Sequence, residues 1–204
     1  MKITLTFTHD GRYTCDGLES ASPARTDYFL LALGPLLASA FCSGCPRFSF
    51  CKLSHVAAGA SEVEGSPAGL AAIKAACKEL GLIFHENHKT YNWFGRWVKD
   101  YHAADAAYKH GFDPSEYGKC DHMIELPGCH YQIGLKKMAS GNFGIIYDFY
   151  GEGRKIMNTL GKGCELLVQH YGLNKAQAIA KNKGYATERK TLLNGDVQLV
   201  VTGV

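Results

Sequence analysis

The sequence predicts an α+β protein, with a mostly antiparallel sheet, helices packed on it and a small ββα unit in front. Short runs of β-forming residues are separated by turn signals, and helical patterns stand between groups of these runs instead of alternating regularly with them. The chain has 204 residues, 46% of them hydrophobic, which is enough to bury a substantial core. Strands and helices segregated in this way favour hairpins over parallel crossovers.

The first 53 residues predict the ββα unit. Residues 2–8 alternate as a strand, Asp10-Gly11 is a hairpin turn, and residues 12–15 return as a second strand. The apolar run 28–41 predicts a core helix with a break at a Gly-Pro pair, and it is shorter than the roughly 20 residues that a bilayer span needs. A unit over residues 1–53 is small for independent stability, so we expect it to dock on the rest of the chain.

The second predicted unit covers residues 54–204 and opens with a strand at 54–64 and a well-marked helix. Ser66 and Pro67 give this helix an N-cap and a first-turn proline. A helical face follows at Leu70, Ile73, Cys77 and Leu80. Gly81 is expected to end the helix, because glycine readily adopts the conformation that a helix terminus requires.

The middle of the second unit predicts an antiparallel meander. Residues 82–88 read as a strand, and 91–119 is polar, aromatic and irregular, with a short helix expected at 103–110. Turns at Pro127-Gly128 and Ser140-Gly141-Asn142 join three β-rich runs. These runs are residues 121–126, 130–137 and 143–150.

The last part of the chain predicts two helical segments and a hairpin. One helical face is formed by Ile156, Leu160, Cys164 and Leu167. We expect Asn174 to cap a further helix at 175–183, which Gly184 ends. The Asn194-Gly195 turn then joins strands expected at 185–192 and 197–202.

Composition and charge narrow the classes of function. The formal net charge of +3 is too mild to indicate DNA binding by itself. The N-terminal residues alternate between apolar and polar, which predicts no secretory signal and therefore a reducing, cytoplasmic location without membrane association. In such a compartment the eight cysteines are better interpreted as free thiols, buried small side chains or metal ligands than as disulfides.

A short tract around residues 42–55 is the candidate metal site. Zinc takes four thiolate or imidazole ligands in a tetrahedron, and closely spaced cysteine pairs supply them. Cys42 and Cys45 have the appropriate two-residue spacing, and Cys51 gives a third ligand. Either Cys15 or His55 completes the set. Zinc is preferred to an iron–sulfur cluster because only three cysteines are close together.

The alternative for this tract is an apolar joint between the two units, because Phe41, Phe48, Phe50 and Leu53 make it as hydrophobic as an ordinary core. A redox dithiol is less favoured, since the cysteine pair follows a predicted helix instead of preceding one.

A second group, at Cys120, His122, Cys129 and His130, has the residue types of a metal site, but its expected geometry argues against one. A two-residue turn would place His122 opposite Ile133, about 13 Å along the strand from Cys129 at roughly 3.3 Å per residue.

The candidate partner-binding residues lie in the irregular stretch. They are Tyr91, Trp93, Phe94, Arg96 and Trp97. Aromatic residues of this density in a loop are unfavourable in water, so they either anchor a protein partner, stack on exposed bases or form a satellite core.

The C-terminal region offers a nucleic-acid hypothesis, whose alternative is a solvated helix surface. Its basic residues are Lys175, Lys181, Lys183, Arg189 and Lys190. A nucleophilic or acid–base enzyme has little support, because the sequence has no Gly-x-Ser-x-Gly elbow and no matched carboxylate pair.

From Ser54 onward the chain resembles an uncharacterised family named after a hypothetical chloroplast reading frame, a domain of unknown function found in cyanobacteria, other bacteria and phages. The matching strings are Ser54-His55-Val56, 70–82 ending in Leu-Gly, 130–135, 147–151 and 196–200. The first forty residues resemble its small companion family, with a Lys-Ile strand, an Asp-Gly turn and a helix. In this chain Ser54-His55 is internal, and Val56 stands where the family has an aromatic residue.

The resemblance implies a fusion of two normally separate partners and an AAA-type ATPase as a neighbour, but no established activity. Three hypotheses follow. The first is a non-enzymatic binding or adaptor protein that acts in a complex through residues 91–97. The second is a zinc or iron–sulfur protein centred on Cys42, Cys45 and Cys51, and the third is a nucleic-acid-binding regulator.

Overall fold

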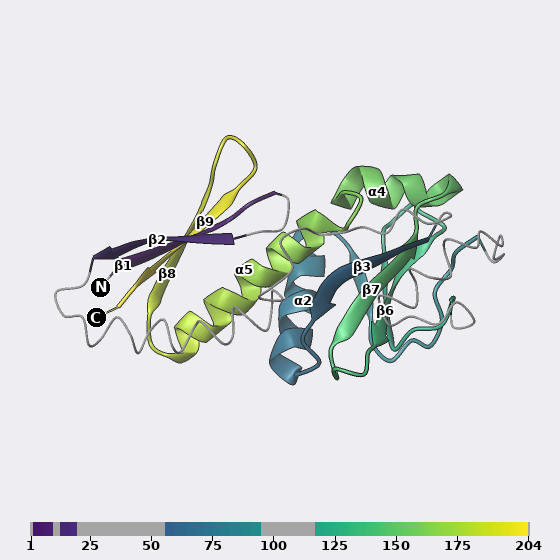
Figure 1. Cartoon of the computed structure of the whole chain (residues 1–204), viewed down its shortest axis with the longest axis horizontal. Helices are drawn as coiled ribbons and strands as arrows, with labels where there is room; N and C mark the ends of the chain where they lie inside the picture. Colours follow the sequence, from purple (N-terminus) through teal and green to yellow (C-terminus); the bar gives the residue numbers. More distant parts are fainter. Residues whose placement is uncertain (1, 10–12, 20–55, 95–116, 204) are drawn as a thin grey trace.

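The computed structural model describes residues 2–9, 13–19, 56–94 and 117–203, and all statements about the fold concern these residues. They form two antiparallel sheets with helices packed on them, as Figure 1 shows, so the predicted α+β class is confirmed. The strands expected in one sheet are divided between two. Four strands follow the order β2-β1-β9-β8, and five follow β3-β7-β6-β5-β4.

The four-stranded sheet contains both ends of the described chain. Its strands are β1 (Lys2–Phe7), β2 (Tyr13–Glu19), β8 (Ala186–Thr191) and β9 (Val197–Thr202). In the central pair, Leu5 of β1 lies opposite Leu199 of β9, and both are buried. The N-terminal hairpin therefore docks on the rest of the chain by sharing a sheet with the C-terminal hairpin. The proposed unit boundary at residue 53 and the helix expected at 28–41 lie outside the described residues.

The five-stranded sheet contains the predicted meander. Its strands are β3 (Val56–Val63), β4 (Ile83–His85), β5 (His122–Glu125), β6 (Gln132–Lys137) and β7 (Phe143–Asp148). Strands β5, β6 and β7 pair in sequence, and β3 and β4 occupy the two edges. One face packs in a core with α2 (Pro67–Glu79), α4 (Arg154–Leu160) and the first half of α5 (Glu165–Asn182). The other face carries a smaller cluster around Tyr91.

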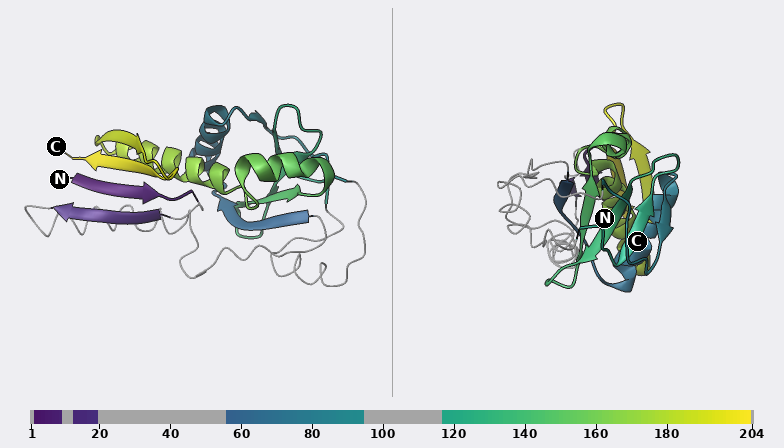
Figure 2. Two further views of the ribbon diagram at one scale, coloured as in Figure 1. Left: turned by 90° about the horizontal axis from the view of Figure 1, so that it is seen from above. Right: turned by 90° about the vertical axis from the view of Figure 1, so that its right-hand side faces the viewer.

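Helix α5 is shared by the two sheets (Figure 1). Its first half contributes Leu167 and Tyr171 to the core of the five-stranded sheet, whereas Leu173, Ala176 and Ala180 pack under the four-stranded sheet. In the view from above, the chain termini lie at one end of the molecule and the five-stranded sheet lies at the other (Figure 2). Helix α5 therefore packs against both sheets and bridges the space between them.

The predicted start and end of α2 are confirmed. The Ser66 hydroxyl accepts a hydrogen bond from the Gly69 N–H at 3.1 Å, and Pro67 is the first helical residue. Gly81 follows the helix with φ of +69°, a backbone conformation that favours glycine. Local sequence signals are sufficient here because each cap is made by residues within one turn of the helix.

The end of α5 at Asn182, followed by Gly184 with φ of +78°, agrees with the prediction, but the other predicted boundaries of α4 and α5 were wrong. The face expected across residues 156–167 is divided, because α4 ends at Leu160 and α5 begins at Glu165, after Cys164 adopts a left-handed conformation with φ of +55°. Asn174 does not cap a helix. It lies inside α5, where its Nδ2 donates to the carbonyl oxygen of His170 at 2.9 Å.

The connection between β5 and β6 is also longer than predicted. Glu125 lies opposite Gln132, so the chain between them does not form a two-residue turn. His122 consequently lies opposite Leu135 and not opposite Ile133. The backbone N–H of Cys129 donates to the Leu126 carbonyl at 3.0 Å, which closes a turn within this connection.

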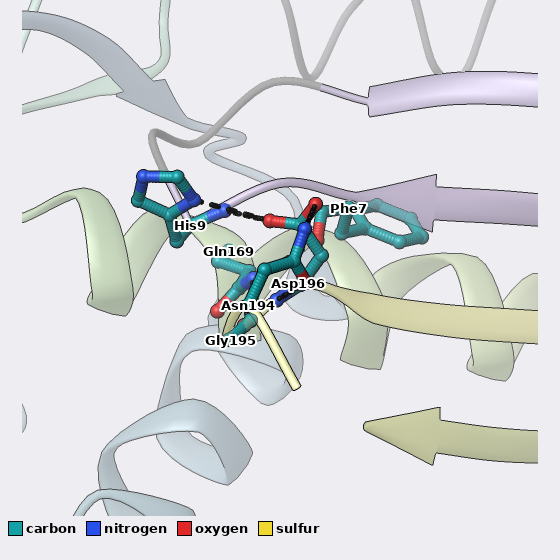
Figure 3. A network of polar contacts seen from close by, with 6 residues as sticks. All are labelled: Phe7, His9, Gln169, Asn194, Gly195 and Asp196. Atoms are coloured by element: carbon teal, nitrogen blue, oxygen red, sulfur yellow. Dashed lines mark hydrogen bonds and ion pairs between the residues drawn. The ribbon is translucent and has the colours of Figure 1, made fainter. Parts of the chain in front are cut away.

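Polar contacts tie the four-stranded sheet to its neighbours. The Gln169 amide of α5 donates to the carbonyl oxygens of Phe7 at 2.9 Å and Gly195 at 3.2 Å, so the turn ends of both hairpins meet the helix (Figure 3). At the end of α2, Glu79 accepts from Arg189 of β8 at 2.8 Å and contacts His170 Nδ1 of α5 at 2.7 Å. These contacts join α2, α5 and β8.

Candidate protein-binding surface

Residues 91–94 run beside the start of β6. The Asn92 N–H donates to the Gln132 side-chain oxygen at 2.9 Å, and the Gln132 N–H donates to the Asn92 carbonyl at 3.0 Å. The Tyr91 N–H donates to the Gly118 carbonyl at 3.0 Å. Asn92 is therefore attached to the start of β6, and Tyr91 is attached by its backbone to the segment that leads into β5.

Asp148, the last residue of β7, organises this region. Its side chain is 1% exposed. Oδ2 accepts from the backbone N–H of Phe94 at 3.1 Å, and Oδ1 accepts from the backbone N–H of Tyr150 at 2.8 Å. One buried carboxylate thus links two chain segments that are more than fifty residues apart, and the two backbone donors offset the cost of burying its polar oxygens.

The residues that Asp148 links present two aromatic rings to solvent. Phe94 is 42% exposed and Tyr150 is 41% exposed. Their ring centroids lie 5.7 Å apart with an interplanar angle of 84°, the favourable edge-to-face arrangement. Trp93 and Tyr117 form a second ring pair, at 5.9 Å, and both are partly buried. We call the exposed pair the Phe94–Tyr150 surface.

Tyr91 lies in the core beneath this region and not on the exposed surface. It is buried with Cys120, Met123 and Ile146, and burial raises the pKa of its phenol far above the usual value. Its ring occupies space that Gly134 leaves open, because a Cβ at position 134 would come within 2.6 Å of the Tyr91 ring. Arg96 and Trp97 lie outside the described residues.

Tyr150 is a functional candidate that the sequence reasoning missed. The signal that could have found it is a tyrosine at the end of a predicted strand and directly before a glycine; in the structure β7 already ends at Asp148, so Tyr150 lies in the turn that follows the strand. In the structure Tyr150 precedes the short 3₁₀ turn η2 (Gly151–Gly153), which leads into α4.

The predicted metal ligands Cys42, Cys45, Cys51 and His55 lie outside the described residues. For Cys15 only the backbone is described, in β2 opposite Leu5. The metal site therefore stays a prediction. Within the ranges that the structure describes, no three histidine, cysteine or acidic side chains come together as a ligand set.

The members of the second cysteine and histidine group do not come together, because Cys120 and Cys129 lie in the clusters on opposite faces of the five-stranded sheet. The Cys120 thiol donates to the His88 carbonyl at 3.1 Å, and the Cys129 thiol donates to the Glu152 carbonyl at 3.4 Å. The His122 ring instead packs against Phe143, with centroids 4.8 Å apart. Burial raises the pKa of Cys120 to about 12, so its sulfur remains a neutral thiol near pH 7.

Several basic side chains of the C-terminal region form ion pairs with acidic side chains of the protein itself. Lys175 is buried and forms an ion pair with Glu64, and Arg189 is paired with Glu79. Lys190 lies 3.6 Å from Glu188. Lysine and arginine side chains that already have acidic partners contribute less to phosphate binding, so this geometry gives the nucleic-acid hypothesis little support.

Comparisons of the chain with protein-family models, with curated proteins and with solved structures found no match. None of the helices in the described ranges is both long enough and apolar enough to span a bilayer.

Proposed function

We propose that this chain is a non-enzymatic binding or adaptor protein whose Phe94–Tyr150 surface contacts a protein partner. The observation that carries the proposal is the exposure of two adjacent aromatic rings whose backbone is held by one buried carboxylate. Tyrosine and tryptophan are enriched among the residues that dominate binding energy, because they bury large areas when a partner covers them.

The contacts of Asp148 make this surface suitable for binding. A flexible loop loses conformational entropy when it is ordered by a partner, and this loss weakens binding. Here the backbone at Phe94 and Tyr150 is already held at 3.1 Å and 2.8 Å from the same carboxylate. The two rings are consequently placed before any partner arrives, and less free energy is spent on ordering them.

The class of partner comes from the family resemblance. Because that resemblance implies an AAA-type ATPase as a neighbour, such an ATPase is the first partner to test. An adaptor needs a stable platform that presents the contact residues, and the five-stranded sheet with its core against α2, α4 and α5 fits this role.

Site-specific photo-cross-linking tests the proposal. A photoreactive phenylalanine analogue replaces Tyr150 in one tagged full-length chain and Leu193, an exposed apolar residue of the C-terminal hairpin, in another. After illumination in cells that encode the protein, we expect one defined protein adduct from position 150 and none of the same identity from position 193. Equal adducts from both positions, or none from position 150, would reject the surface.

A further inference from the structure

The turn of the C-terminal hairpin contains a bond that is chemically reactive in unfolded chains. We propose that Asn194-Gly195 is a latent deamidation site, which Asp196 holds unreactive in the folded protein. Both Asn194 and Gly195 are exposed to water. Glycine lacks a Cβ, so its backbone nitrogen can approach the side chain of a preceding asparagine more closely than any other residue allows.

The reaction needs only water and hydroxide. The Gly195 backbone nitrogen loses its proton to hydroxide and forms a bond to Cγ of Asn194. The bond between Cγ and Nδ2 then breaks, and the nitrogen takes up a proton and leaves as ammonia. Water opens the resulting cyclic imide at either carbonyl, which leaves an aspartate or an isoaspartate at position 194. The net change is one water consumed and one ammonia released.

In the fold, both ends of the Asn194 amide are bonded to Asp196 (Figure 3). Nδ2 donates to the Asp196 carboxylate at 2.7 Å, and Oδ1 accepts from the Asp196 backbone N–H at 3.1 Å. The attacking nitrogen is also engaged, because the Gly195 N–H donates to the Leu192 carbonyl at 3.1 Å. Ring closure has to break these hydrogen bonds. Nδ2 must also gain a proton to leave as ammonia, and the ionised Asp196 carboxylate to which it is bonded has no proton to donate.

Asp196 is itself held in place from the other hairpin. The His9 backbone N–H donates to its Oδ1 at 2.9 Å, and His9 Nδ1 lies 3.2 Å from the same oxygen. The hydrogen bond from the His9 backbone is the main cause that keeps the pKa of Asp196 below its usual value, so the carboxylate remains an acceptor near neutral pH. The protection of Asn194 therefore depends on the pairing of the first and last strands.

Deamidation would alter the junction of the two sheets. The new carboxylate at position 194 would stand where Nδ2 now lies, 2.7 Å from an Asp196 oxygen, so two like charges would replace a donor–acceptor pair. An isoaspartate would also lengthen the backbone beside Gly195, whose carbonyl accepts from Gln169 of α5. The modification would loosen the attachment of the hairpin to the helix.

Peptide mass spectrometry with enzymatic isoaspartate detection tests the proposal in warm, mildly alkaline buffer. We expect position 194 to deamidate at least about tenfold faster in urea and in folded Asp196→Ala than in the folded wild-type chain, which corresponds to about 1.4 kcal/mol of barrier. Asn158 and Asn182, which precede Thr159 and Lys183, serve as internal references in the same digest.

If Asp196→Ala does not fold, Asp196→Asn serves instead, because it keeps the shape of the side chain and removes the charge. Equal rates in the folded and urea-unfolded wild-type chain would overturn the proposal. A folded Asp196 variant that reacts as slowly as the wild type would show that Asp196 is not the protecting residue, and would overturn it equally.

Discussion

At the scale of single residues, Asp148 has the largest consequence for the proposed function. A buried carboxylate is costly unless its oxygens accept hydrogen bonds, and those of Asp148 accept from the two backbone groups that position the exposed rings. The sequence shows an aspartate in a Tyr-Asp-Phe-Tyr string but cannot show this role, because one of its two partners is Phe94, far away in the chain.

Replacing Asp148 with alanine is expected to lower the free energy of unfolding by about 1–3 kcal/mol, because two part-buried backbone N–H groups lose their acceptor. Urea denaturation measures this loss. The matched control is Asp121→Ala, since Asp121 also accepts from a backbone N–H, that of Lys137 at 2.7 Å, but in an exposed position. A loss at position 148 no larger than that at position 121 would contradict the role given to Asp148.

The predicted metal site is tested by elemental analysis of chain purified without a metal-affinity tag. If Cys42, Cys45 and Cys51 bind zinc, we expect a zinc content close to one per chain, which falls sharply in the Cys42→Ser/Cys45→Ser double variant. Protein without zinc or iron would rule out the metal hypothesis. Cys77→Ser is the control, because Cys77 is buried in the core and is expected to leave the zinc content unchanged.

At the scale of elements, local signals predicted the structure well where a few neighbouring residues decide it. The start of α2 depends on Ser66 and Pro67, and the last hairpin depends on Asn194-Gly195, as the sequence indicated. The break between α4 and α5 could not be predicted in the same way. It requires a left-handed Cys164, which is uncommon for a residue with a side chain, and its thiol is buried in the core.

The break between α4 and α5 gives an element-scale prediction at Gly161. This glycine has φ of +85°, and a Cβ there would come within 2.1 Å of the Glu165 carboxylate, which accepts from the Gly163 N–H. Gly184 has a similar φ of +78° but open space around it. Gly184→Ala should therefore cost about 1–2 kcal/mol of backbone strain, and Gly161→Ala should cost more. Urea denaturation of both variants compares them, and equal losses would contradict the account of this break.

At the scale of the whole molecule, the pairing of β1 with β9 was beyond prediction from local patterns. Each strand is recognisable, but the choice of partner joins residues almost two hundred positions apart and depends on burial of both strands against α5. The same holds for the Phe94–Tyr150 surface. The sequence indicated the aromatic stretch, whereas Tyr150 and the burial of Tyr91 follow from tertiary packing.

The junction at Glu79 predicts a pH dependence of stability. Burial alone would raise the pKa of Glu79, but hydrogen bonds from His170, Arg189 and Asn174 outweigh it, so the pKa lies below 4.5. A carboxyl whose pKa is lowered by folding stabilises the protein fully above its unfolded-state pKa near 4.5, and this contribution is lost as the pH falls through the folded-state value.

Glu79→Gln should therefore be less stable than the wild type near neutral pH, by no more than about 1 kcal/mol because the side chain is partly exposed. The difference should shrink as the pH falls below about 4.5. Urea denaturation over this range measures it, with Glu188→Gln, on β8 beside the Glu79 partner Arg189, as the control at neutral pH. A difference that grows as the solution becomes more acidic would contradict the assignment.

Quantitative affinity purification from cells that encode the protein tests the central claim most directly. The double variant Phe94→Ala/Tyr150→Ala is compared with the wild type and with Ile83→Ala/Leu193→Ala, which removes two exposed apolar residues elsewhere. All three chains should keep similar urea midpoints. We expect the amount of a partner that is reproducibly recovered with the wild type to fall at least about tenfold with the first variant. The second variant should recover as much of this partner as the wild type does. Equal recovery with both variants, or no reproducible partner of the wild type, would contradict the claim.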